Sequence, residues 1–69
     1  MRIDKRKLDL ELARRSMTVG ELRKRSGVPP ATITRIINGT RKGRPVTIGR
    51  IAAALDIDPK ELLVDSEEN

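Results

Sequence analysis

The chain has no aromatic side chain with which to build a core: none of its 69 residues is Phe, Tyr or Trp, and none is Cys or His. Its core must be aliphatic, and 36% hydrophobic residues fill one small helical core rather than a layered one. No segment alternates apolar and polar residues, so we expect no sheet beyond a strand stub at Met1–Ile3. Disulfide scaffolds, Cys/His zinc sites, triads with His or Cys, and base stacking on aromatic rings are excluded.

The charge is unevenly distributed along the chain. Residues 1–50 carry fourteen of the fifteen bases and four of the ten acids, a charge of +10, whereas residues 51–69 carry −5. Between Leu22 and Leu55 there are eight bases and no acid. Such a stretch indicates a polyanionic partner, the alternative being a solvated basic face without one.

Capping residues predict where the first two of five short helices begin and end. The first helix is expected to start after Asp4 as its N-cap and to end near Arg15–Ser16. Thr18 and Glu21 form a capping box that opens the second helix. This helix ends at Ser26–Gly27, because glycine readily adopts the left-handed conformation that follows a helix.

Proline and polar caps mark the other three helices. Pro30 is suited to the first position of the third helix, which ends at Asn38-Gly39. Thr47 is predicted to cap the fourth helix. Asp58 and Glu61 form a second capping box, which predicts a short fifth helix.

Residues 18–39 have the layout of a helix-turn-helix, with two short helices joined by a tight turn around Ser26-Gly27-Val28. In this motif the second helix enters the major groove of DNA. The isoleucines of that helix point inward. Its outward residues are Pro30, Ala31, Thr32, Thr34 and Arg35.

Four blocks of residues extend this pattern: Thr18-x-x-Glu21-Leu22, Ser26-Gly27-Val28, Thr32-Ile33-x-Arg35-Ile36-x-Asn38-Gly39, and Ile51-Ala52-x-Ala54-Leu55 followed by Asp58-x-x-Glu61-Leu62. In these blocks the chain resembles the phage λ repressor/Cro-like (xenobiotic response element type) helix-turn-helix proteins, from residue 3 to about residue 64. The resemblance implies an all-α, compact five-helix bundle, with the helix-turn-helix at helices 2 and 3. It also implies binding to duplex DNA, most often as a two-fold dimer on a palindromic operator.

The sequence departs from that family at several positions. Arg23 stands where a small Ala is usual between the two helices of the motif. Leu12 and Ile37 replace an Arg and a Glu that often pair in the family, which predicts an apolar Leu12–Ile37 contact in place of a buried ion pair. Pro30 and Ala31 occupy places where polar residues commonly touch bases, which weakens the polar readout.

The candidate DNA contacts divide into base contacts and phosphate contacts. Arg35 is the best candidate base reader, because arginine pairs bidentately with guanine; a phosphate contact or a free surface side chain is the alternative. Thr32 and Thr34 are predicted to hydrogen-bond a base edge or a phosphate, and Ala31 to touch a thymine methyl group or merely start the helix. The candidate phosphate contacts are Thr18 and Asn38, by resemblance, and Arg41, Lys42 and Arg44, by the charge of the loop at residues 39–46.

These features predict a sequence-specific transcriptional regulator, a repressor, that binds double-stranded DNA as a homodimer on a pseudo-palindromic site. We expect a DNA-binding domain at residues 1–64, a short acidic tail at residues 65–69, and a cytoplasmic location, with no membrane segment, catalysis, metal, cofactor or small-molecule ligand. The alternative is a protein-interaction module, such as an antitoxin or a mobile-element accessory factor. A large exposed apolar patch around Leu10, Leu63 and Val64 would favour it, whereas packing of Leu10 in the core would not.

Overall fold

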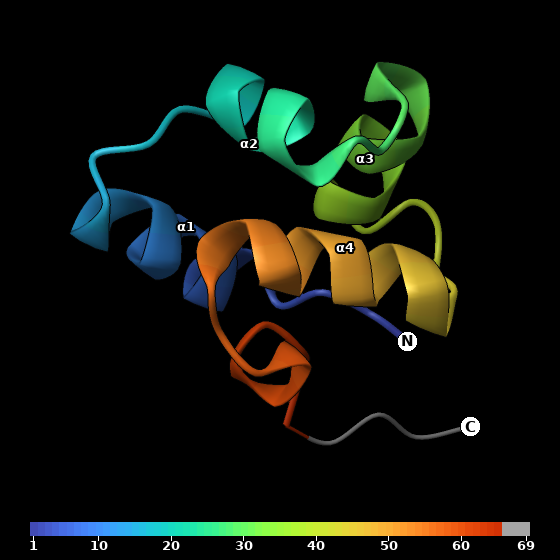
Figure 1. Ribbon diagram of the computed structural model, residues 1–69. Helices are drawn as coiled ribbons and strands as arrows, with labels where there is room; N and C mark the ends of the chain where they lie inside the picture. The colour runs from blue at the N-terminus through green and yellow to red at the C-terminus, as the bar shows by residue number, and fades with distance from the viewer. Residues whose placement is uncertain (66–69) are drawn as a thin grey trace.

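The structure, a computed structural model, describes residues 1–65 and consists of helices joined by short loops (Figure 1). Its elements are α1 (Lys5–Arg14), α2 (Val19–Ser26), α3 (Pro30–Ile37), α4 (Pro45–Leu55) and the short 3₁₀ helix η1 (Pro59–Glu61). The predicted all-α class is therefore confirmed. No helix in the described part of the chain is long and apolar enough to cross a membrane.

The predicted fifth α-helix is wrong, because the chain forms a single 3₁₀ turn there and then pairs with the N-terminal segment. The Asp4 N–H donates to the Leu62 carbonyl (2.8 Å), and the Val64 N–H donates to the Arg2 carbonyl (3.1 Å). These bonds flank an isolated antiparallel bridge at Ile3. Backbone groups used in this bridge are not available to extend a helix. Within residues 1–65 the fold therefore has four α-helices and a 3₁₀ turn in place of five helices.

Local capping explains the ends of α1 and α2. The Asp4 carboxylate accepts hydrogen bonds from two N–H groups of the first turn of α1. The predicted capping box of α2 is present: the Glu21 N–H donates to the Thr18 hydroxyl (3.1 Å), and the Thr18 N–H donates to the Glu21 carboxylate (3.0 Å). Gly27 follows α2 in the left-handed conformation, with φ of 70°. These bonds satisfy backbone groups that helix ends leave without partners.

The predicted caps of the later elements need correction. Helix α4 begins at Pro45, with Arg44 at the N-cap position, so Thr47 lies inside the first turn and does not cap the helix. Proline suits this first position because its ring fixes φ and no N–H is needed there. Asp58 does cap η1, but its carboxylate accepts from the N–H of Lys60 (2.9 Å), two residues on, in a 3₁₀ turn too short for an α-helical capping box.

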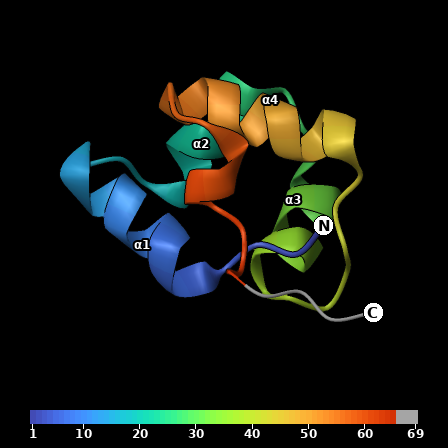
Figure 2. The same ribbon diagram turned by 90° about the horizontal axis from the view of Figure 1, so that it is seen from below.

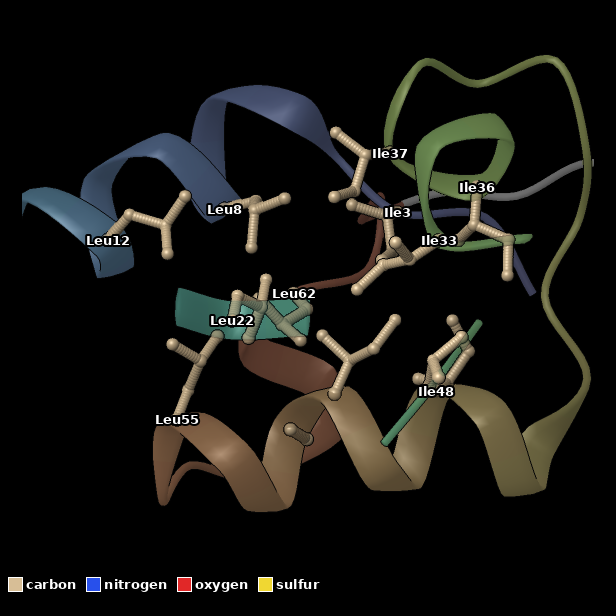
Figure 3. Close-up of a cluster of buried hydrophobic side chains, with 13 residues drawn as sticks. Ile3, Leu8, Leu12, Leu22, Ile33, Ile36, Ile37, Ile48, Leu55 and Leu62 are labelled. Carbon is tan, nitrogen blue, oxygen red and sulfur yellow. The ribbon is translucent and has the colours of Figure 1, made fainter. Parts of the chain in front are cut away.

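One aliphatic core joins the four α-helices with Ile3 before α1 and Leu62 after η1 (Figure 3). Helix α4 runs across the fold between α2 and η1 (Figure 1). The core contains both Leu12 and Ile37, and Figure 3 shows Leu8 between them in this view. Their direct contact stays a prediction. The thirteen buried apolar residues are Ile3, Leu8, Leu12, Leu22, Val28, Ile33, Ile36, Ile37, Ile48, Ile51, Ala52, Leu55 and Leu62.

The C-terminal segment packs against α1 through a few specific contacts. The Lys7 ammonium group donates to the Leu63 carbonyl (2.9 Å) and pairs with Asp65, and this bond to the Asp65 carboxylate raises the pKa of Lys7. Leu63 and Val64 are half-buried, whereas Leu10 is 55% exposed and does not pack in the core. The rest of the predicted acidic tail lies outside the described residues.

A pair of glycine substitutions should have opposite effects on stability. Gly27→Ala places a side chain on a left-handed residue and should lower the free energy of unfolding by about 1 kcal/mol. Gly49→Ala, inside α4, adds a methyl group that meets no atom within 4 Å. It should raise the free energy of unfolding by roughly 0.5–1 kcal/mol, because alanine favours a helix interior. Urea unfolding followed by far-ultraviolet circular dichroism measures both; equal effects would contradict this explanation of Gly27.

The capping box predicts a stability difference that depends on pH. Hydrogen bonds from the Thr18 N–H and hydroxyl lower the pKa of Glu21 below its usual 4.5. The charged carboxylate therefore stabilises the fold above pH 4.5, and this contribution disappears as the pH falls through the lowered pKa. Glu21→Gln keeps a hydrogen-bonding group without the charge. The variant should be less stable than the wild type at pH 7, with the difference shrinking towards pH 3; a constant difference in urea unfolding would refute the assignment.

Candidate nucleic-acid interface

The packing of α3 decides which of its side chains reach solvent. Its three isoleucines are buried in the core. An α-helix turns by about 100° per residue, so the opposite side of α3 carries Ala31 and Arg35, and both are exposed. Thr32 and Thr34 are half-buried. They lie on the two flanks of the exposed side, Thr34 towards α2 and Thr32 towards α4.

On the α2 flank, an arginine contacts the predicted site residue Thr34. Arg23 Nη2 donates to Thr34 Oγ1 (3.3 Å), and Arg23 Nε is buried without a hydrogen-bond partner among the described residues. The sequence marked Arg23 as unusual but did not predict its contact with Thr34. The exposed face of α3 is thus bordered on this side by a cation held between the two helices of the motif.

On the α4 flank, a groove of about 320 Å³ separates α3 from the loop and the start of α4. Four of its lining side chains are cationic. One of them, Arg50, was not among the predicted contacts. The sequence could have suggested it, because it is the only basic residue of α4 and lies between Leu22 and Leu55, where there is no acidic residue. The lining residues are Val28, Pro29, Thr32, Ile36, Arg41, Lys42, Arg44, Val46, Thr47 and Arg50.

The backbone of the basic loop at Gly43 packs closely against the side chain of Ile48 on α4. A Cβ atom on Gly43 would lie 2.6 Å from Ile48 Cδ1, so only glycine fits there without movement of the isoleucine. The Gly43 N–H donates to the Met1 carbonyl (2.8 Å), and Arg2 Nη1 donates to the Gly39 carbonyl (3.3 Å). Figure 2 shows the N-terminus beside α3 and this loop. The N-terminal segment therefore helps to fix the loop beside the groove.

Ion pairing neutralises one side of the molecule more than the other. Three basic residues of α1 and its C-cap Arg15 form four ion pairs. Glu11 contacts Arg14 (3.2 Å) and Arg15 (2.8 Å), and the other two pairs are Lys5–Asp9 and Lys7–Asp65. Within residues 1–65, the arginines at 35, 41, 44 and 50 form no ion pair. These four arginines lie around α3 and the start of α4, and their unpaired positive charge there favours an anion.

Two predicted phosphate contacts lie away from this groove. Thr18 is exposed at the start of α2, but its hydroxyl accepts from the Glu21 N–H and donates to the Glu21 carboxylate (3.2 Å). Asn38 is exposed at the C-terminal end of α3. The structure thus places Thr32 in one groove with the three basic side chains of the loop at residues 39–46. Thr18 and Asn38 do not line this groove.

Comparison with known proteins identifies the family. The family model for the Cro/C1-type HTH DNA-binding domain matches residues 7–68, nearly the whole chain. Searches of the curated proteins and of the solved structures gave no significant match. The match spans both helices of the helix-turn-helix and the α4 segment that completes the groove. The chain therefore belongs to the Cro/C1-type helix-turn-helix DNA-binding family.

Proposed function

We propose that this protein is a non-enzymatic, sequence-specific repressor that inserts α3 into the major groove of duplex DNA. It acts in the cytoplasm as a homodimer on a pseudo-palindromic site, where occupation of the duplex blocks other proteins. The observation that carries the proposal is the exposed side of α3, with Arg35 at its centre, next to a groove lined by four basic side chains. Phosphate contacts orient such a module on the duplex, and side chains of the inserted helix read the bases.

The proposed contacts follow the two surfaces of the site. Arg35 pairs with guanine, Ala31 meets a thymine methyl group, and Thr32 bonds a base edge or a nearby phosphate. Thr34 was the fourth predicted base contact, and its hydroxyl already accepts a bond from Arg23. The proposed phosphate contacts are Arg41, Lys42, Arg44 and Arg50 around the groove, and Thr18 and Asn38 beyond it.

The protein-interaction alternative has less support. It required a large exposed apolar patch around three residues, but only Leu10 is exposed, while Leu63 and Val64 are half-buried. Leu10 lies in a second groove whose other lining residues are all charged, on α1, η1 and Asp65. A single leucine among charged side chains is ordinary protein surface.

Selection of bound duplexes from a random double-stranded pool tests the function directly. At moderate salt, we expect enrichment of a two-fold site whose half-sites are centred about one helical turn apart. A pool carried through without protein is the control. Enrichment of one half-site would refute the homodimer but keep sequence recognition. Retention without enrichment, lost on adding salt, would refute sequence recognition and leave only a basic surface.

Two arginine substitutions should separate base reading from phosphate binding. Arg35→Ala should reduce discrimination at one base pair by about 1–3 kcal/mol. Arg41→Ala should weaken binding to all duplexes alike and lower the slope of log affinity against log salt by about 1. Lys60→Ala, on η1 and away from the groove, is the matched control. Equal loss of discrimination in the Arg35 and Arg41 variants would contradict the division of roles.

A further inference from the structure

The contact between Arg23 and Thr34 joins the two helices of the helix-turn-helix by side chains. Arg23 lies on α2, Thr34 lies on α3, and the bond between them measures 3.3 Å. A surface arginine normally extends its charged head into water. Here the side chain is half-buried, and its Nε is enclosed without a partner among the described residues. Arg23 also forms no ion pair within residues 1–65.

The chemistry of arginine makes this contact restrictive. The guanidinium group is planar and permanently charged, and its donors point in fixed directions. Enclosing it without a carboxylate costs free energy, so the hydroxyl of Thr34 is its one observed compensation. Rotating α3 about its axis would carry Thr34 away from Arg23 and break the hydrogen bond that α3 accepts from the cation. The contact therefore favours one rotation of α3 relative to α2.

That rotation also sets the direction of the residues proposed to read bases. Thr34 directly precedes Arg35 in α3, and Ala31 lies one turn before Arg35. A helix rotates as a unit, so a displacement at Thr34 moves both residues together. Base recognition requires side chains to be placed accurately, and a small misplacement weakens it.

We propose that Arg23 is a positioning residue for base recognition, which fixes the rotation of α3 through its bond to Thr34. The hydroxyl of Thr34 serves this bond and does not read a base. This inference rests on the proposed DNA-binding function. It predicts that Arg23 and Thr34 act as one unit whose removal lowers sequence discrimination.

A double-mutant cycle tests the proposal on the full chain. The ratio of affinities for the selected duplex and for a scrambled duplex is measured for Arg23→Met, Thr34→Val and the double variant. Each should lower the ratio by about tenfold, and the double variant should lose no more than either single variant, because all three remove the same bond. Thr34→Ser keeps the hydroxyl and should retain the ratio. Arg23→Lys keeps the charge without the planar fork and should lose it.

Other outcomes overturn the proposal. A normal ratio in Arg23→Lys would mean that Arg23 supplies only charge, as a phosphate contact does. Additive losses, with the Thr34→Val effect confined to one base pair, would mean that Thr34 itself reads a base. Unchanged ratios in Arg23→Met and Thr34→Val would leave the bond a merely structural role.

Controls separate this inference from folding effects and from the function itself. Circular dichroism at the assay temperature shows whether each variant is folded; if Arg23→Met is not, the Thr34→Val and Thr34→Ser pair decides. Lys24→Met, at an exposed neighbouring position of α2, removes one charge and should keep the ratio. A wild type that does not prefer the selected duplex would refute the proposed function as well, whereas a preference that the variants retain would refute only this inference.

Discussion

Burial of the three isoleucines of α3 is the interaction on which the rest of the structure depends. An isolated helix of eight residues is not stable in water, so α3 exists because Ile33, Ile36 and Ile37 pack into the shared core. The same packing turns Arg35 outward. Because the chain has no aromatic residue, the core is built from aliphatic side chains, and each of the four α-helices of residues 1–65 contributes some of them. Stability and the direction of the candidate reading face are therefore consequences of one packing arrangement.

The N-terminal segment connects parts of the fold that are distant in sequence. Its backbone pairs with the chain after η1 around Ile3, and its first residues bond the loop at Gly39 and Gly43. Residues that precede α1 thus support both the last element of the fold and the loop that carries the basic side chains. A surface loop of this composition would otherwise have few partners. The candidate phosphate contacts owe part of their placement to this segment.

Electrostatics divide the molecule into two sides. Carboxylates pair with Lys5 and Lys7 of α1, and Glu11, which is 7% exposed, pairs with both Arg14 and Arg15. Beside α3 and α4, Arg41, Arg44 and Arg50 lie along one groove without an ion pair within residues 1–65, so their charge is available to a polyanion. Arg23 differs from these bases, because it is held between two helices. Its position suits orientation of α3 more than capture of phosphate.

Features that depend on neighbouring residues could be read from the sequence. The caps at Asp4, Thr18 and Gly27 and the inward isoleucines of α3 were predicted, because their hydrogen bonds and periodicity involve residues within about one turn. The three basic residues of the loop were predicted as phosphate contacts from charge alone; all three line the groove, and their contact with phosphate stays a prediction. The cap predicted at Thr47 failed locally, because α4 begins two residues earlier at Pro45. The other failures arose where distant segments meet. The bridge between Ile3 and Leu63 replaced the expected fifth helix with η1. Arg50 lines the groove from α4, and Arg23 contacts Thr34, eleven residues away. Such contacts follow from how helices pack in three dimensions, and local sequence patterns do not encode that packing.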